Sequence, residues 1–156
     1  MIGFDYHRPR DLAEAAALLG QSETRALAGG MTLLPTIKNR LAAPAALVDL
    51  SSLPGLTAIG EEAGALTIGA LARHADVARS ALVQARIPAL AALAGSIGDP
   101  AVRHRGTIGG SLANNDPAAD YPAAVLGLGA TVVTSKREIA ADDFFRGLFE
   151  TALAEG

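Results

Sequence analysis

Cationic, glycine-rich and amide-bearing residues crowd together in residues 103–120, RHRGTIGGSLANNDPAAD. Gly109 and Gly110 lack a Cβ, so they let the backbone take positive φ and come within hydrogen-bonding distance of a ligand. The hydroxyls of Thr107 and Ser111 are potential donors to that ligand, and Asp120 offers a carboxylate to hydroxyl groups. Turn-forming residues lie between them: Asn114, Asn115, Asp116 and Pro117. The alternative is structural: the glycines serve one tight turn and Asp120 is the N-cap of the next helix.

Another glycine pair lies upstream, between a predicted buried strand over residues 25–28 and a predicted helix over residues 33–40. With Thr32 as the N-cap, Gly29 and Gly30 come immediately before the helix. This arrangement presents unpaired N–H groups and the positive end of a helix dipole toward one point. A phosphate or diphosphate is the natural occupant, and a turn that binds no ligand is the alternative.

Composition limits the classes of function. The chain has 156 residues, a net charge of −3 and no cysteine. The length predicts one domain or two small lobes. The negative net charge argues against nucleic-acid binding. An anionic ligand would have to be held by local backbone amides. Without cysteine the chain has no disulfide, thiolate zinc site or iron–sulfur cluster of its own.

Histidines and apolar runs are also informative. His7, His74 and His104 lack the spacing of metal ligands, so no metal site is predicted, and His74 is expected to be a surface or capping residue. The beginning of the chain lacks the layout of a signal peptide, and no apolar run approaches the ~20 residues needed to cross a bilayer. We therefore expect a cytoplasmic protein.

Hydrophobic patterning predicts alternating strands and helices, with a break at residues 51–55 that separates two lobes. The expected strands cover residues 4–7, 25–28, 46–50, 57–60, 65–69, 130–134 and 138–140, and the expected helices cover residues 11–19, 33–40, 71–80, 88–95 and 122–129. A capped turn is expected at residues 142–145. The chain contains neither a dinucleotide fingerprint that opens a helix nor a GxxxxGK[ST] phosphate loop.

With both glycine segments considered, the sequence resembles the FAD-binding (medium) subunit of molybdenum hydroxylases, the xanthine dehydrogenase and carbon monoxide dehydrogenase family. The matching segments are AGGMTLLP at 28–35, IGDP at 97–100, RGTIGGSLA at 105–113, PAADYP at 117–122 and FFRGLFET at 144–151. They extend over almost the whole chain. The segment at 105–113, with its spacing to Asp120, is the more specific of the two glycine signatures.

The resemblance implies an α+β, two-lobed PCMH-type FAD-binding domain: a small N-terminal β/α lobe over residues 1–54 and a larger mixed α+β lobe over residues 55–156. FAD would lie between the lobes. The residues expected to contact it are Ala28, Gly29, Gly30, Met31, Thr32, Leu33, Ile97, Thr107, Ile108, Gly109, Gly110, Ser111, Asn114 and Asp120.

Two departures from the family pattern matter. In distant flavoproteins of the same fold, the position of Met31 can hold a histidine covalently joined to flavin. Methionine cannot form that bond, so FAD is expected to be non-covalent. Family members also continue beyond the position of Gly156 into the rest of the second lobe and a C-terminal domain, so we expect the second lobe to be incomplete.

By resemblance, the expected function is electron transfer in an oxidoreductase complex. A large subunit with the molybdenum cofactor oxidises the substrate, a small subunit with 2Fe-2S clusters relays electrons, and FAD on the medium subunit passes them to an external acceptor. No catalytic acid, base or nucleophile is expected in this chain. The alternatives are a docking subunit without flavin and a module for another nucleotide diphosphate. The substrate and the acceptor are not identified by the sequence.

Overall fold

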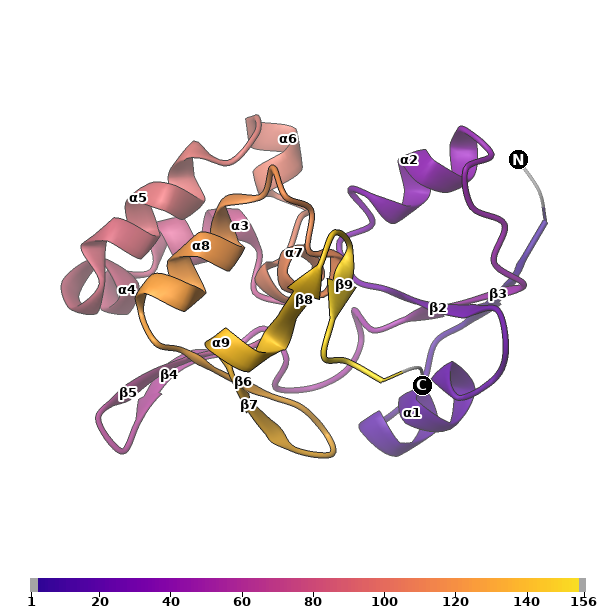
Figure 1. Cartoon of the computed structure of the whole chain (residues 1–156), viewed down its shortest axis with the longest axis horizontal. Helices are drawn as coiled ribbons and strands as arrows, with labels where there is room; N and C mark the ends of the chain where they lie inside the picture. Colours follow the sequence, from indigo (N-terminus) through magenta and orange to yellow (C-terminus); the bar gives the residue numbers. More distant parts are fainter. Residues whose placement is uncertain (1–2, 155–156) are drawn as a thin grey trace.

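The computed structural model describes residues 3–154, which form two lobes that meet near the middle of the molecule (Figure 1). The first lobe contains a three-stranded sheet and two helices. Its elements are β1 (Asp5–His7), α1 (Leu12–Leu19), β2 (Thr24–Leu27), α2 (Leu33–Lys38) and β3 (Ala46–Asp49). The strand order is β1-β3-β2, and both neighbours run parallel to β3.

The central strand forms because its side chains are continuously apolar, which is the pattern of a parallel strand covered on both faces. Leu47 and Val48 of β3 are fully buried. By contrast, β2 lies at the edge of the sheet, and Arg25 and Ala26 are exposed. The prediction that β2 is a buried strand was therefore wrong, because a short apolar stretch does not reveal which strand is central.

Helix α1 begins at an N-cap, since Asp11 Oδ1 accepts a hydrogen bond from the amide of Glu14 at 2.8 Å. Its buried face packs on Val48 and Leu53 through three residues, Ala15, Leu18 and Leu19. The apolar residues Leu12 and Ala16 of the same helix are exposed.

The second lobe is mainly helical and carries three small hairpins. Its elements are β4 (Ile59–Glu62), β5 (Ala65–Ile68), α3 (His74–Arg79), α4 (Ala81–Arg86), α5 (Pro88–Ser96), α6 (Pro100–Arg103), α7 (Ile108–Asn114), α8 (Asp120–Gly127), β6 (Thr131–Val133), β7 (Glu138–Ala140), α9 (Ala141–Phe144), β8 (Phe145–Gly147) and β9 (Glu150–Thr151). Its core joins α3, α4, α5 and α8 around fully buried Val77, Val83, Ala94 and Tyr121.

Several boundaries differ from the predictions. Helices α4 and α6 were not predicted; each begins at a side-chain cap, because Ser80 Oγ accepts from Val83 N at 3.3 Å and Asp99 Oδ1 accepts from Val102 N at 2.9 Å. Strands β8 and β9 were also missed, and Gly95 lies inside α5 rather than at its end.

Other boundaries agree more closely. The hairpin β4–β5, the pair β6–β7 and helices α1, α2, α5 and α8 occur at the predicted places, within a few residues. Helix α3 begins three residues later than predicted, at His74, because the preceding backbone pairs with the segment that contains Thr107. Leu53 and Leu56 both pack on the core of the first lobe, and the lobe boundary between residues 54 and 55 stays a prediction. None of the helices in residues 3–154 is long and apolar enough to cross a membrane.

Candidate functional site

The two glycine segments meet backbone to backbone at the junction of the lobes. A Cβ added to Gly29 would lie 2.0 Å from the carbonyl oxygen of Arg105 and 3.0 Å from the Cα of Gly106. Next to this contact, the Ala28 side chain lies 3.8 Å from where a Cβ on Gly110 would be. The structure thus brings together two segments that are far apart in the sequence, and only glycine at position 29 permits their approach.

The first glycine segment, residues 28–33, leaves its amides free. Gly30 has a φ of +75°, which favours glycine. Its carbonyl accepts from Leu34 N at 3.1 Å, but no acceptor within the described residues takes an amide of the segment itself. Thr32 is the N-cap of α2 as predicted, although its side chain makes no cap bond, and Met31 and Thr32 are exposed. Free N–H groups therefore belong to this segment.

The second glycine segment uses its amides internally. The amides of residues 108 and 109 donate to the carbonyls of Ala72 and Ala70 at 3.0 and 2.8 Å. The amides of residues 110 and 111 donate to the hydroxyl and the carbonyl of Thr107 at 3.1 and 3.0 Å. These four amides are therefore not free for a ligand, because this segment is the capped first turn of α7.

The glycine pair of this segment has a packing role. Neither Gly109 nor Gly110 uses the positive φ that a missing Cβ allows. A Cβ on Gly109 would lie 2.6 Å from the carbonyl oxygen of Ala70, and one on Gly110 would lie 2.8 Å from Thr107 Oγ1. The missing side chains allow α7 to approach the chain that precedes α3.

Of the remaining predicted contacts, Ser111 and Asn114 lie in α7, Asp120 begins α8, and Ile97 follows α5. Ser111, Asn114 and Asp120 make no side-chain hydrogen bond within the described part of the chain. Asp120 is exposed and is the first residue of α8, whose N-cap is Ala119, so its alternative role as the N-cap was wrong. Ile97 is half-buried and packs against the second-lobe core.

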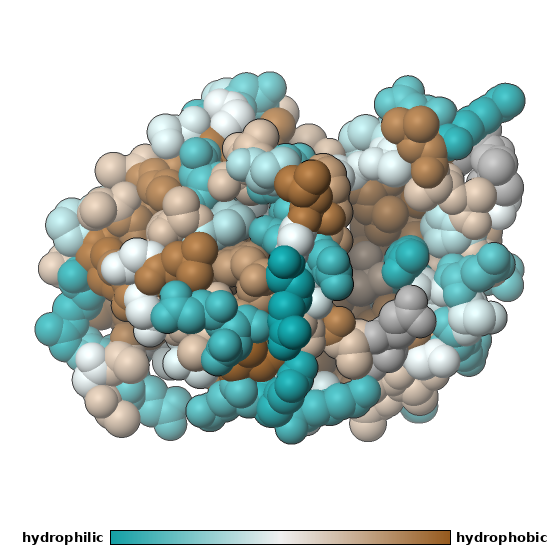
Figure 2. Space-filling view, viewed as in Figure 1, coloured by the Kyte–Doolittle hydropathy of each residue, from teal (hydrophilic) through white to brown (hydrophobic). Residues whose placement is uncertain are grey.

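A cleft of about 340 Å³ lies between the lobes, at the carboxyl ends of β1, β2 and β3. It is lined by Tyr6, Arg8, Leu27, Ala28, Gly29, Asp49, Ser51, Thr57, Leu71, Arg73, Arg105 and Thr107. The surface in Figure 2 is also hollowed between the two lobes. Ligands of parallel sheets bind outside the carboxyl ends of the strands. Arg8, Arg73 and Arg105 were not predicted as site residues. Of the three, only Arg105 could have been found from the sequence, by its place in the glycine motif.

Asp49 is the one carboxylate in this lining, and it is surrounded by donors. The Tyr6 hydroxyl donates to Asp49 Oδ2, the amide of Ser51 donates to Oδ1 at 2.9 Å, and Arg8 Nε lies 3.9 Å from Oδ2. Burial opposes ionisation of Asp49, but these hydrogen bonds and the charge of Arg8 outweigh it and lower the pKa of the carboxyl. The hydrogen bond to Asp49 raises the pKa of Tyr6. Asp49 is therefore an ionised anchor whose charge is already compensated.

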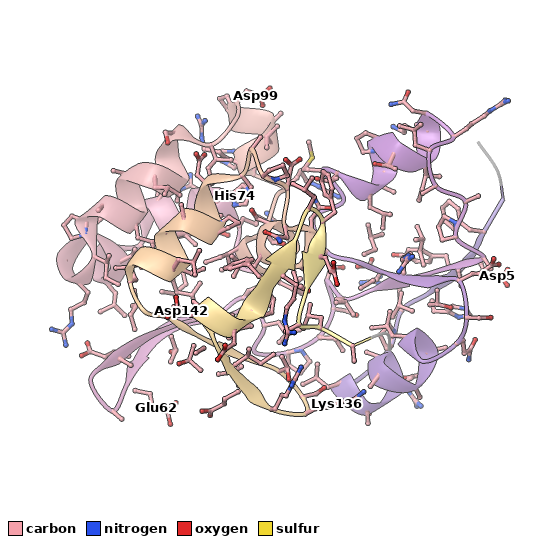
Figure 3. All side chains as sticks on the ribbon, in the orientation of Figure 1. Asp5, Glu62, His74, Asp99, Lys136 and Asp142 are labelled. Atoms are coloured by element: carbon pink, nitrogen blue, oxygen red, sulfur yellow. The ribbon has the colours of Figure 1, made fainter. Side chains whose placement is uncertain are left out.

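His74 and Tyr121 form a buried pair behind the second glycine segment. Their ring centroids are 5.3 Å apart, and Figure 3 places His74 among the helices of the second lobe. His74 is 5% exposed, so its prediction as a surface or capping residue was wrong. His74 Nδ1 and Tyr121 Oη have no hydrogen-bond partner among residues 3–154. Burial lowers the pKa of His74 and raises that of Tyr121. Within residues 3–154, no three His, Asp or Glu side chains gather in a group that could hold a metal.

Comparison with known proteins gives the family. Residues 2–156 match the family described as "FAD binding domain in molybdopterin dehydrogenase". The carbon monoxide dehydrogenase medium chain of Hydrogenophaga pseudoflava is 44% identical over 97% of this chain and 55% of its own length. The nicotine 6-hydroxylase medium subunit of Paenarthrobacter nicotinovorans is 38% identical over 96% of this chain and 54% of its own length. The chain thus spans about half the length of these relatives.

Solved structures agree with the sequence relatives. Carbon monoxide dehydrogenase from Hydrogenophaga pseudoflava superposes with a TM-score of 0.94 at 44% identity, over 97% of this chain and 55% of that one. Quinoline 2-oxidoreductase from Pseudomonas putida 86 superposes with a TM-score of 0.93 at 36% identity, over 98% of this chain and 55% of that one. These findings confirm the resemblance and the α+β PCMH-type fold. The chain belongs to the family of FAD-binding domains of molybdopterin dehydrogenases.

Proposed function

We propose that this chain is the FAD-binding part of the medium subunit of a molybdenum hydroxylase-type oxidoreductase. When bound, FAD supplies the redox chemistry that takes up electrons and passes them to an external acceptor. The electrons would come from 2Fe-2S clusters of a small subunit, after substrate oxidation at the molybdenum cofactor of a large subunit. This chain binds and orients the flavin and contributes no catalytic acid, base or nucleophile.

The observation that carries the proposal is the run of free amides from Ala28 to Leu33, beside the contact between Gly29 and Arg105. A diphosphate needs several donors at one place, and this segment offers backbone N–H groups that no protein acceptor occupies. The cradle at Gly29 and Gly30 has no side chain that would obstruct the approach of such a group. These residues fit FAD.

The second glycine segment contributes side chains rather than amides. The Thr107 hydroxyl accepts from Gly110 N, and its own proton remains available to a ligand oxygen. Ser111, Asn114 and Asp120 offer polar groups with no hydrogen bond in the described chain, and a carboxylate suits ribose or ribityl hydroxyls. Ile97 offers an apolar contact for the flavin. We propose that Ile108, Gly109 and Gly110 position these groups.

A titration of the chain with FAD, followed by flavin fluorescence, tests the proposal. We expect saturable, reversible binding that Asp120→Ala weakens roughly tenfold, the loss expected for one charge-assisted hydrogen bond. Asp120 is exposed and unbonded, so the variant should melt like the parent. Asp142→Ala is the matched control, because Asp142 is an exposed first-turn acid of another helix, α9, and is not among the residues expected to contact FAD.

The other outcomes separate the alternatives. An absence of FAD binding, both alone and with the partner subunits added, would contradict the proposal and favour a docking subunit without flavin. Binding of ADP as tight as binding of FAD would favour a module for another nucleotide diphosphate. A covalent adduct that survives denaturation would contradict the non-covalent attachment, since Met31 replaces the residue that forms such bonds.

A further inference from the structure

Gly106 lies against both the His74 imidazole and the first glycine segment. A Cβ added to Gly106 would lie 2.5 Å from His74 Nε2, and one added to Gly29 would lie 3.0 Å from the Cα of Gly106. The backbone adds another connection, because His74 N donates to the carbonyl of Gly106 at 3.0 Å. One buried residue without a side chain therefore lies between the imidazole and the segment that we propose to bind the flavin.

The packing around His74 couples its ring to Gly106. His74 is 5% exposed, and its ring packs against fully buried Tyr121 of α8, with the two ring centroids 5.3 Å apart. Gly106 N donates to the carbonyl of Val102 at 2.7 Å, which ties the glycine to α6. Because protein interiors are close-packed, a shift of the imidazole is passed on to its neighbours rather than absorbed by a void. Gly106 is the neighbour that reaches the first glycine segment.

The surroundings of His74 favour the neutral imidazole. Nδ1 has no hydrogen-bond partner among residues 3–154, and neither has the hydroxyl of Tyr121. A protonated imidazole carries an N–H on both nitrogens, so it would bury a charge together with an unpaired donor. Burial accordingly lowers the pKa of His74. Proton uptake is therefore easiest when the ring moves toward water or an acceptor, away from its present contacts.

Charged side chains on the neighbouring elements do not offset this cost, because none of them forms a hydrogen bond or an ion pair with the ring in the part of the chain that is described. Helix α5 contributes no charged residue. The charged or titratable residues on α3 and around it are Arg73, Asp76 and Arg79 of the same segment, Arg86 of α4, Arg103 of α6, His104 and Arg105 before Gly106, and Asp120 and Tyr121 of α8. Asp76 pairs with Arg79, and Arg86 pairs with Glu61.

We propose that neutral His74 is a positioning residue for FAD binding: its ring supports Gly106 against Gly29 and so holds the amides of residues 28–33 in the arrangement that binds the flavin. This inference rests on the proposed function. Protonation moves the ring, releases Gly106 and loosens the arrangement. FAD affinity should therefore be constant at high pH and fall as the pH drops through the pKa of His74 in the folded chain. By reciprocity, bound FAD lowers that pKa further.

FAD affinity measured by flavin fluorescence from about pH 5 to pH 8, the range in which histidine changes charge, is the first test. For the parent chain we expect Kd to rise at least about threefold from pH 7 to pH 5, within the limit of about tenfold per pH unit for one proton. His74→Gln should bind with the same affinity throughout, because its amide does not titrate. His104→Gln is the matched control and should keep the parent profile, because His104 is exposed and lies just before Gly106. Thermal melting at each pH verifies that parent and variants are folded.

Proton NMR provides a second test that needs no substitution at His74. The chain has three histidines, so His7→Gln and His104→Gln assign two of the imidazole signals and leave the third to His74. In the parent chain, saturating FAD should shift the titration midpoint of the His74 signal to lower pH. A histidine with only a packing role would titrate at the same pH with and without FAD.

The outcomes separate this inference from the proposed function. A pH profile of FAD binding that is identical in the parent and in folded His74→Gln overturns the inference, as does a His74 titration that FAD leaves unchanged. Either result leaves the flavin function intact, because FAD still binds. Absence of FAD binding at every pH, with and without the partner subunits, overturns the proposed function and this inference with it. If His74→Gln does not fold, the NMR titration of the parent chain decides.

Discussion

Alanine at Gly29 would place a methyl group where the two lobes touch. The added Cβ would lie 2.0 Å from the Arg105 carbonyl oxygen, whereas ordinary contacts begin at 3.4 Å, so the lobes must separate by about 1.4 Å, the difference between these distances. Both neighbours are backbone atoms, so no side-chain rotation relieves the overlap. Overpacking of this kind costs about 1–3 kcal/mol of unfolding free energy.

The expected result for Gly29→Ala is measurable in two assays. A loss of about 2 kcal/mol lowers the melting temperature of a domain of this size by about 4–8 °C. Displacement of the segment at 28–33 from the second lobe should also weaken FAD binding, as measured by flavin fluorescence. The φ of Gly29 is not in the left-handed region, so the effect would come from contact rather than from backbone preference.

Gly127→Ala is the matched control. Gly127 ends α8, nothing lies within 4 Å of its added Cβ, and its φ is not positive. Alanine there should leave stability unchanged or raise it by up to about 1 kcal/mol, because alanine favours helix and restricts the unfolded chain. A Gly29→Ala variant that melts within 1 °C of the parent (roughly 0.3–0.5 kcal/mol) and binds FAD equally would refute the backbone contact.

Other substitutions test the second lobe. Asn115→Ala should lower the free energy of unfolding in urea by about 2 kcal/mol, because Nδ2 donates to Gly147 O at 2.7 Å and Glu150 O at 2.9 Å and the residue has a φ of 45°. Asn115→Gly should lose only about half as much, and an Asn115→Ala variant as stable as the parent would contradict this role. Burial lowers the pKa of His74, so the unfolded chain takes up the proton first, and stability should fall as pH drops below about 6.5, by at most about 1.4 kcal/mol per pH unit. His74→Gln should lose that pH 5–7 component, and identical slopes would count against it. Tyr121→Phe removes a buried hydroxyl without a partner, so stability measured by urea unfolding should stay equal or rise by up to about 1 kcal/mol; a clear loss would show that the hydroxyl is bonded in solution.

The sequence predicted those parts of the fold whose signals are local. The apolar run of β3, the Asp11 cap of α1 and the glycines before α2 each depend on a few neighbouring residues. Helix α4 was missed because its six residues are too short for a period, and its cap is a single serine hydroxyl bond. Strands β8 and β9 were missed because pairing between such short segments has no pattern of its own.

The candidate site was predicted only in part, because it is formed by contacts between segments that are far apart in the sequence. The arginines of the cleft were missed because Arg73 lies in a region predicted as helix, whereas its backbone forms an extended bridge to Thr107. His74 was predicted as a surface or capping residue because a single histidine in a short helix is usually exposed, and only the fold buries it against Tyr121.

Two glycine pairs that look alike in the sequence therefore have different structural roles. The pair at 29–30 leaves its backbone amides without an acceptor in residues 3–154, as the proposed diphosphate contact requires. Gly109 lies against the backbone of Ala70, close to the bridge between Arg73 and Thr107, two residues that line the cleft. A bulky residue at 109 would thus impair ligand binding by displacing the wall of the cleft, even though its amide is already bonded within the protein. Loss of FAD binding in such a variant would report on the fold, whereas weaker FAD binding by Asp120→Ala would report on the proposed contact with the ligand.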